Sequence, residues 1–497
     1  MTPQHLDRLS SIDAGFLAQE KPNTHMHIGG LVLLDGPPPE LGEFLGHVRS
    51  RLHLVPRYRQ KLAFPRFESG RPLWIDDPTF NLSYHVRHTA LPAPGDEAAL
   101  LRLAARIFSQ RLDRSKPLWE LWLIEALADG GFALISKSHH ALVDGISGAD
   151  LGAVLFDLTP EGTVLPPAPP WVPKPEPSAA QLVARGVEGA AKRVAGLATG
   201  AVHEAADPRD LLSRARGVAE GVGAVARTAL SPPPATPFNV EPGPHRRIAL
   251  VRAELAEFRE VKATLGGTVN DVVLAAVAGG IAHFLRARDV ATDGMALRAC
   301  VPVSVRTDAT KSSMGNEITI MMAPLPVDVA GPLARLHAVR EAMDGLKESK
   351  QALGAKAIAE LQDFAPPTIF AQASRLQFSG RMYNLLVTNV PGPQFPIYVL
   401  GRRMRSMFPI PFLAGPRGLA VAIMSYDGGM NFGLLGDYDA LPDLDVVAEG
   451  IEGALAELVA IARKQQRIEQ RKSKRRSAGN GAAAQAQAES KPRSPTG

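Results

Sequence analysis

The chain has 497 residues, more than a single domain usually holds, so we expect two domains, each with a core of its own. A hydrophobic content of 45% and a charged content of 21% are ordinary for a globular protein. The single cysteine, Cys300, excludes an intramolecular disulfide. It lies in an apolar run, which favours a buried, inert thiol and fits a reducing cytoplasm.

The net charge of +5 is concentrated at the C-terminal end of the chain. From Arg463 onward ten Lys or Arg residues stand against two Glu, so the rest of the chain is slightly acidic. No basic stretch with interleaved aromatic residues occurs elsewhere, which argues against a nucleic-acid-binding protein. The N-terminal segment lacks the pattern of a secretory signal, and no run approaches the roughly 18 apolar residues of a membrane-spanning helix.

Hydrophobic periodicity predicts mixed strands and helices in the first third of the chain. Strands are expected at residues 26–34 and 81–88, and helices at residues 39–54, 96–112 and 146–158. Two further apolar segments, residues 121–126 and 132–138, flank Asp129-Gly130-Gly131 and predict a β-hairpin.

The segment that follows this hairpin reads Ser-His-His-Ala-Leu-Val-Asp-Gly and covers residues 138–145. Because imidazole titrates near neutral pH, His139 or His140 at a strand exit can exchange a proton with a bound hydroxyl group. Asp144 is expected to point back into the protein and pair with an Arg, while Gly145 permits positive φ or the close approach of a ligand. The plainer alternative is a strand end with one buried structural histidine.

Two other kinds of site are disfavoured at this segment. Neighbouring strand residues point to opposite faces and no third ligand is evident, so we predict no metal site at His139 and His140. The stretch Gly145-Ile146-Ser147-Gly148 lacks the spacing of the Gly-x-Ser-x-Gly motif, which argues against a lipase.

Two proline-rich stretches, residues 166–177 and 232–244, bracket an insert rich in Ala, Gly and Val. Proline clusters stop helices and favour extended backbone, so these stretches mark the ends of an interdomain connection. Apolar residues of the insert fall on one side of an expected helix. This helix is either packed on the surface of the body or a mobile segment that faces lipid.

The second half again mixes strands and helices without a fixed repeat. Strands are expected at residues 247–252, 297–303, 317–324, 384–389, 418–425 and 430–435. Helices are expected up to residue 265, at residues 269–286, from residue 333 with an interruption to residue 378, and at residues 444–470. Thr268 occupies an N-cap position, and Asp271 in the first turn suits the helix dipole. Beyond Lys472 no core-forming residues occur, so we expect disorder.

Several motifs in the right order resemble those of a known family. His-His-x-x-x-Asp-Gly between an apolar strand and a helix resembles the active-site motif of the CoA-dependent acyltransferase superfamily, which includes chloramphenicol acetyltransferases and peptide-synthetase condensation domains. Further segments resemble the bacterial wax ester synthase/diacylglycerol acyltransferase family over residues 9–461. These segments are Ser11-Ile12-Asp13-Ala14-Gly15-Phe16, Pro117-Leu118-Trp119-Glu120, Asn270-Asp271 and Asn389-Val390-Pro391-Gly392-Pro393.

The resemblance implies an α/β fold in which two chloramphenicol-acetyltransferase-like domains enclose an active-site channel at their interface. We therefore expect an N-terminal domain at residues 1–160, which carries the His pair, and a connection at residues 161–245. A C-terminal domain is expected at residues 246–462, and a basic tail at residues 463–497.

The resemblance also implies acyl-CoA-dependent O-acyl transfer to diacylglycerol or a long-chain alcohol, with acyl-CoA as a substrate and no cofactor. His140 takes the role of general base, and His139 that of a packing or orienting residue. Asn270, beside Asp271, is the candidate oxyanion donor or substrate positioner, although a helix-start Asn can equally satisfy the backbone. Pro117-Leu118-Trp119 is either a structural turn with a core Trp or a contact for the acyl chain.

Two alternative functions stay open. One is condensation-type acyl transfer from a carrier-protein thioester, and the other is a non-catalytic protein associated with lipid droplets. The expected location is cytoplasmic, with the basic tail in peripheral contact with the inner membrane or a lipid droplet. The acceptor, the acyl-chain length and the oligomeric state do not follow from the sequence.

Overall fold

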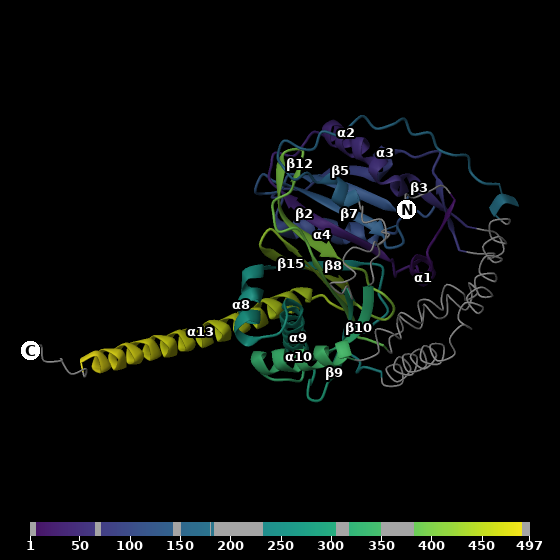
Figure 1. The fold of residues 1–497 in the computed structure, drawn as a ribbon. Coiled ribbons are helices and arrows are strands. Elements are labelled where there is room, and N and C mark those ends of the chain that lie inside the picture. Colours follow the sequence, from purple (N-terminus) through teal and green to yellow (C-terminus); the bar gives the residue numbers. More distant parts are fainter. Residues whose placement is uncertain are drawn as a thin grey trace, which may run out of the picture.

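A computed structural model of the chain describes residues 6–64, 71–142, 151–178, 180–182, 232–304, 318–348 and 382–489. Within these ranges the chain forms a mixed α/β fold with two six-stranded sheets and one three-stranded sheet (Figure 1). Each large sheet packs against helices around an apolar core, so the expected two-domain α/β architecture is confirmed.

The first large sheet carries the His pair and has the strand order β12-β13-β2-β7-β6-β5. Its strands are β2 (His27–Leu34), β5 (Val86–Ala90), β6 (Trp119–Glu125), β7 (Phe132–His139), β12 (Tyr398–Val399) and β13 (Arg402–Ile410). β6 and β7 form the predicted antiparallel hairpin, with Leu123 opposite Leu134. Because β7 lies between β2 and β6, its last residues are held from both sides.

Strands β12 and β13 come from the last third of the chain, and the sequence-based prediction does not include them. β13 pairs with β2, so that Phe408 lies opposite Leu31. Its sequence, Arg-Arg-Met-Arg-Ser-Met-Phe-Pro-Ile, mixes charged residues and a proline with apolar ones. Hydrophobic alternation therefore does not reveal it. The N-terminal sheet is completed by a segment that lies within the range expected for the C-terminal domain, residues 246–462.

The two faces of this sheet bury different helices, because successive residues of a strand point to opposite sides. In β7, Leu134 packs on the side of α2 (Leu41–Arg51), whereas Ile135 packs against α4 (Glu97–Ser109). The other N-terminal elements are α1 (Ser11–Gln19), η1 (Leu52–Leu54), η2 (Pro56–Arg59), α5 (Leu151–Leu155) and the small sheet of β1 (Asp7–Arg8), β4 (Leu73–Asp76) and β3 (Gln60–Ala63).

The strand predicted at residues 81–88 is wrong in its first half. Residues 82–85 form a short helix, α3 (Leu82–His85), and the strand begins only at Val86. The Asn81 side chain accepts a hydrogen bond from the Ser83 N–H at 3.0 Å. This N-cap bond favours a helical turn over extended backbone.

The second large sheet has the strand order β10-β9-β11-β14-β15-β8. Its strands are β8 (Arg246–Glu254), β9 (Ala296–Ser304), β10 (Ile318–Pro326), β11 (Leu385–Pro391), β14 (Leu419–Tyr426) and β15 (Gly429–Asp437), all close to their predicted positions. The helices are α8 (Leu255–Leu265), α9 (Val269–Ala287), α10 (Pro332–Glu348) and α13 (Leu444–Glu489). Cys300 on β9 is buried, and burial raises the pKa of its thiol to about 12, so the thiol is inert.

Helix α9 is the central helix of the C-terminal domain. Among the described helices it alone is long and apolar enough to cross a membrane, yet 78% of its apolar stretch is buried inside the protein. A Cβ atom on Gly279 would lie 2.5 Å from Ala454, and one on Gly280 would lie 2.5 Å from Ile451. These glycines therefore let α13 approach closely, and α9 is a core helix.

Helix α4 lies between the two domains. Its Ile107 and Phe108 share an apolar cluster with Ile135 of the first sheet and with Ile248 and Leu435 of the second. The two sheets thus use α4 as a common layer.

The first proline-rich stretch lies along the N-terminal domain. Trp171 packs edge-on against Phe80, and the guanidinium of Arg59 lies 4.9 Å from the Trp171 ring centre. The Lys174 N–H donates to the Asp76 carboxylate at 3.0 Å. These contacts tie the start of the expected interdomain connection to the body. Residues 183–231, which hold most of the insert and of its expected helix, lie outside the described residues.

Helix α13 leaves the body as a long projection (Figure 1). It continues to Glu489, so the disorder predicted beyond Lys472 is wrong for residues 473–489. This part of the chain is rich in Ala, Gln, Lys and Arg, which are good helix formers even where no core is available.

Candidate active site

The backbone of the His pair is held by three strands. His139 ends β7 opposite His27 of β2, and its N–H donates to the Leu118 carbonyl at 3.0 Å. The His140 N–H donates to the Met26 carbonyl at 2.8 Å. The chain therefore leaves the sheet at a defined point, just beyond the end of α4.

His139 is buried and neutral. Its Nδ1 accepts a hydrogen bond from the Ala141 N–H at 3.0 Å, which places the proton of the neutral ring on Nε2. That nitrogen lies 3.8 Å from Oε1 of Glu20. Burial lowers the pKa of His139 to about 3, although the Glu20 carboxylate opposes the shift. This geometry suits an orienting residue better than a proton carrier at neutral pH.

His140 lies between two aromatic rings. Phe16 of α1 stacks on it with 3.8 Å between ring centres, and Phe412 meets it edge-on at 5.8 Å. Burial lowers the pKa of His140 to about 4, so the imidazole is an unprotonated base at neutral pH. Its Nδ1 is buried and has no hydrogen-bond partner within the described part of the chain.

The surroundings of His140 are apolar and come from both domains. Phe16, Met26, Phe412 and Ala414 form one buried cluster, against which Leu386 of β11 packs. A neutral base in such surroundings can act on a hydroxyl group whose remaining structure is hydrophobic. The His pair thus lies at the junction of the two sheets, where the resemblance places the channel.

Two buried charged residues near the His pair are not among the site residues expected from the sequence. Glu20 is bound by Arg111 and Arg114 and lies beside His139. Lys137 is fully buried on β7, and its Nζ donates to the carbonyls of Ile107 and Gln110 at the end of α4. The alternation of β7 places Lys137 and His139 on one face, but no local pattern identifies Glu20.

Pro117-Leu118-Trp119 contacts the His pair through its backbone, and its side chains lie in the core of the N-terminal domain. The Trp119 side chain is 1% exposed, donates from Nε1 to the Tyr58 carbonyl at 2.8 Å and stacks on His85 at 4.6 Å. Leu118 is buried, and its carbonyl holds His139. Trp119 is therefore a core residue in this structure.

Asn270 and Asp271 lie in the first turn of α9 in the C-terminal domain. The Asp271 carboxylate accepts the Thr268 N–H at 2.8 Å, and Thr268 Oγ1 accepts the Asp271 N–H at 3.2 Å. Among the residues the structure describes, no hydrogen bond or ring contact joins Asn270 or Asp271 to the His pair. Oδ1 of Asp271 is buried without a hydrogen-bond partner there. Asp144 and Gly145 lie outside the described residues.

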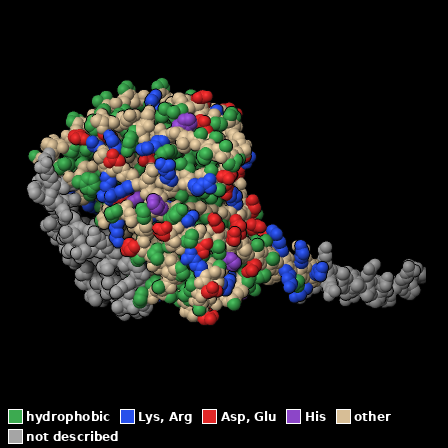
Figure 2. Space-filling model, turned by 180° about the vertical axis from the view of Figure 1, so that it is seen from behind, with side chains coloured by type: hydrophobic (Ala, Val, Ile, Leu, Met, Phe, Trp, Pro, Cys, Tyr) green, Lys and Arg blue, Asp and Glu red, His purple; other side chains and the backbone are tan. Residues whose placement is uncertain are grey.

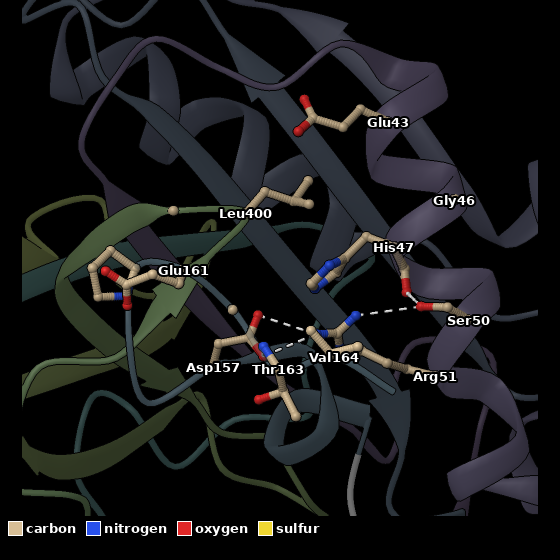
Figure 3. Close-up of a pocket in the computed structure, with 13 residues that line it drawn as sticks. Glu43, Gly46, His47, Ser50, Arg51, Asp157, Glu161, Thr163, Val164 and Leu400 are labelled. Carbon is tan, nitrogen blue, oxygen red and sulfur yellow. Dashed lines mark hydrogen bonds and ion pairs between the residues drawn. The ribbon is translucent and has the colours of Figure 1, made fainter. Parts of the chain in front are cut away.

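A separate pocket of about 510 Å³ opens beside α2 (Figure 3). Arg51 donates to both oxygens of Asp157 at 2.8 and 3.0 Å, and His47 bonds the Leu155 carbonyl at 2.8 Å. The charges of Arg51 and Asp157 compensate one another, and His47 has a hydrogen-bond partner, so we assign these residues a structural role. Across the described ranges, no group of three or more His, Cys, Asp or Glu side chains is arranged to hold a metal ion.

Comparison with known proteins agrees with this site. The wax ester synthase/diacylglycerol acyltransferase catalytic domain matches residues 9–273, and the C-terminal domain of the same family matches residues 314–459. The probable diacylglycerol O-acyltransferase tgs1 of Mycobacterium tuberculosis is 34% identical over 464 residues, which cover 92% of this chain and 97% of that protein. The probable diacylglycerol O-acyltransferase tgs2 of the same organism is 31% identical over 91% of this chain and 99% of its own length.

Solved structures share the fold. The wax ester synthase/diacylglycerol acyltransferase from Marinobacter aquaeolei VT8 superimposes with a TM-score of 0.63 and 27% identity, covering 92% of this chain and 100% of that chain. The trichothecene 15-O-acetyltransferase of Fusarium sporotrichioides, at 12% identity, has a TM-score of 0.57 over 92% of this chain and 97% of its own. The match over both domains, together with the His pair at their junction, shows that the chain belongs to the wax ester synthase/diacylglycerol acyltransferase family.

Proposed function

We propose that this protein is an acyl-CoA-dependent O-acyltransferase that esterifies diacylglycerol, with a long-chain alcohol as the alternative acceptor. The observation that carries the proposal is a neutral His140 in an apolar cluster at the domain junction. An imidazole that is unprotonated at neutral pH can accept the proton of a hydroxyl group. The apolar neighbours suit an acyl chain and a lipophilic acceptor.

In the proposed reaction, His140 removes the acceptor's hydroxyl proton while the oxygen attacks the thioester carbonyl. The tetrahedral intermediate then expels the CoA thiolate, which takes the proton back from His140. One C–O bond forms, one C–S bond breaks, and no acyl-enzyme is required. Asn270 stays our predicted donor to the oxyanion, and Asp144 our predicted anchor of the turn after the pair.

Diacylglycerol is the first acceptor to test, because the Mycobacterium relatives at 31–34% identity carry that name. The purified full-length chain is incubated with a long-chain acyl-CoA and either diacylglycerol or a long-chain alcohol. Thiol release is followed, and the ester is identified by thin-layer chromatography. Release of CoA with free fatty acid and no ester in either assay would refute the proposal.

The same assay separates the alternatives. A condensation-type enzyme would need a carrier-protein thioester and would not form an ester with a free diacylglycerol or long-chain alcohol. A non-catalytic droplet protein would bind lipid equally well with or without the imidazole of His140. Ester formation from acyl-CoA that is lost in a folded His140→Ala variant excludes both.

We further propose that the protein is cytoplasmic and contacts an anionic membrane surface peripherally through α13. Lys464, Arg467, Arg471 and Lys472 are exposed on the projecting helix, where Figure 2 shows a cluster of basic side chains. Basic residues close to an anionic leaflet are attracted to it. Such contact would bring the site close to its lipid acceptor.

A further inference from the structure

Helix α1 presents two side chains to the His pair. Phe16 lies within the helix and Glu20 at its C-cap, four residues later, so both lie on one side of it. Phe16 stacks on His140 at 3.8 Å with an angle of 21° between the rings. Oε1 of Glu20 lies 3.8 Å from Nε2 of His139, the nitrogen that carries the proton.

Glu20 is a buried carboxylate fixed by cations. Its side chain is 1% exposed, and Oε2 accepts from Nε of Arg114 at 2.8 Å and from Arg111 at 3.0 Å. Burial raises the pKa of this carboxyl, but the charges of Arg114 and Arg111 hold it below its usual value. The group is therefore ionised at neutral pH. With Oε2 engaged by both arginines, Oε1 is left facing His139 and His27.

Contacts at both ends of α1 fix its position. Ser10 caps its first turn by accepting the Asp13 N–H at 3.1 Å. Just after Glu20, the Arg246 guanidinium binds the Asn23 carbonyl, which ties this end of α1 to strand β8 of the other domain. A helix fixed at both ends can hold Phe16 and Glu20 against the pair.

We propose that α1 acts as a clamp on the His pair, in which Glu20 positions His139 and Phe16 positions the ring of His140. The Ala141 N–H bonds Nδ1 of His139, and the Glu20 carboxylate faces Nε2 at 3.8 Å, beyond hydrogen-bond distance, so Glu20 acts on the ring through its charge. Stacking by Phe16 then selects the orientation of the His140 ring. The catalytic consequence rests on the proposed function, because it concerns His140 as the general base.

The direct test is Glu20→Ala, with Glu20→Gln as the conservative variant. Gln keeps an oxygen that can face His139, so it should restore part of what Ala loses. We expect Glu20→Ala to lower kcat by about 10-fold or more while KM for acyl-CoA stays within about twofold, since misplacement of a base affects the chemical step. Asp157→Asn is the matched control, a buried carboxylate paired with Arg51 beside the pocket of Figure 3. It should lower Tm and leave kcat within about twofold.

Two further measurements keep the inference falsifiable. If Glu20→Ala does not fold, Phe16→Leu retains apolar volume without touching the ion pairs, and it should also lower kcat several-fold. NMR of histidine-labelled full-length protein reads the His139 tautomer without any turnover, and Glu20→Gln should change the signal of the ring protonated at Nε2. An unchanged His139 signal, or a normal kcat in folded Glu20→Ala or Phe16→Leu, would overturn the clamp. Absence of turnover in the unaltered protein would instead refute the proposed function, while the NMR signals still test the clamp.

Discussion

The backbone N–H of His139 donates to the carbonyl of Leu118 at 3.0 Å, and the residue after Leu118 is a tryptophan locked in the core. Two sequence motifs that lie about 20 residues apart thus meet as neighbouring strands of one hairpin. Pro117-Leu118-Trp119 acts on the site through this backbone bond. Its side chains fill the N-terminal core.

Trp119→Phe should destabilise the fold without weakening substrate binding. The substitution removes the Nε1 hydrogen bond to the Tyr58 carbonyl and part of the stacking on His85, so we expect a loss of about 1–3 kcal/mol in the free energy of unfolding. Chemical denaturation measures the loss. At every acyl-chain length tested, KM for acyl-CoA should be the same in the variant as in the unaltered protein.

Trp122→Phe is the matched control. The Trp122 side chain is only partly buried, whereas Trp119 is fully buried, so loss of the Trp122 indole, which donates to the Glu120 carboxylate at 3.1 Å, should cost less. A chain-length-dependent rise in KM for Trp119→Phe would show that this side chain contacts the acyl chain.

His140→Ala should abolish acyl transfer while the protein stays folded. Loss of a general base lowers rates by about 100-fold or more. The replaced ring lies between Phe16 and Phe412, so circular dichroism and Tm must accompany the kinetics. His47→Gln serves as the control, because His47 is also buried but bonds the Leu155 carbonyl beside α2. Near-normal turnover in folded His140→Ala would refute the mechanism.

The pH dependence of kcat/KM should extend to unusually low pH. Burial lowers the pKa of His140 to about 4, and the base must be unprotonated to act, so activity should persist as pH falls through 6.5. We expect the acid limb of kcat/KM, which reports on the free enzyme, to have its midpoint close to pH 4.

Initial rates are required for this measurement. A histidine whose pKa is lowered by burial binds a proton more readily when the chain is unfolded. The free energy of unfolding therefore falls as pH drops from the unfolded pKa of about 6.5 toward 4. Unfolding and protonation of the base must therefore be separated in time. An acid limb centred near pH 6.5, with the protein still folded, would contradict the lowered pKa.

Local patterns predict the hairpin and the His pair but not the residues that hold the pair. β6 and β7 are neighbours in sequence, and their apolar alternation identifies them. Glu20 binds Arg111 and Arg114, which lie 91 and 94 residues further along the chain. Its neighbours in the sequence form no motif that would identify it as a site residue. β13 pairs with β2, although several hundred residues and most of both domains lie between them in the sequence. Pairings of this kind depend on tertiary packing, which local periodicity does not encode.

The basic end of α13 begins where its packing ends. Between residues 444 and 473 of the helix, Ala462 is the last buried residue, Arg463 pairs with Glu260 at 3.2 Å, and Gln466 donates to Thr264 at 2.7 Å. The exposed residues beyond these contacts include Arg467, Arg471 and Lys472. A truncation after Gln466 therefore leaves these two contacts intact.

Deleting residues 467–497 should weaken binding to anionic vesicles and leave kcat on dispersed short-chain substrates unchanged. Basic residues near an anionic surface contribute roughly 1 kcal/mol each, so replacing Arg467, Arg471 and Lys472 by Gln in the full-length chain should lower vesicle affinity by about 100-fold. Sedimentation with vesicles containing phosphatidylserine at low salt measures the binding.

Raising the salt should abolish the difference, because screening shortens the reach of these charges to about 10 Å or less. Neutral vesicles are the control, and the three proteins should bind them equally. Equal binding of the truncated, substituted and unaltered proteins to anionic vesicles at low salt would show that α13 is not the membrane contact.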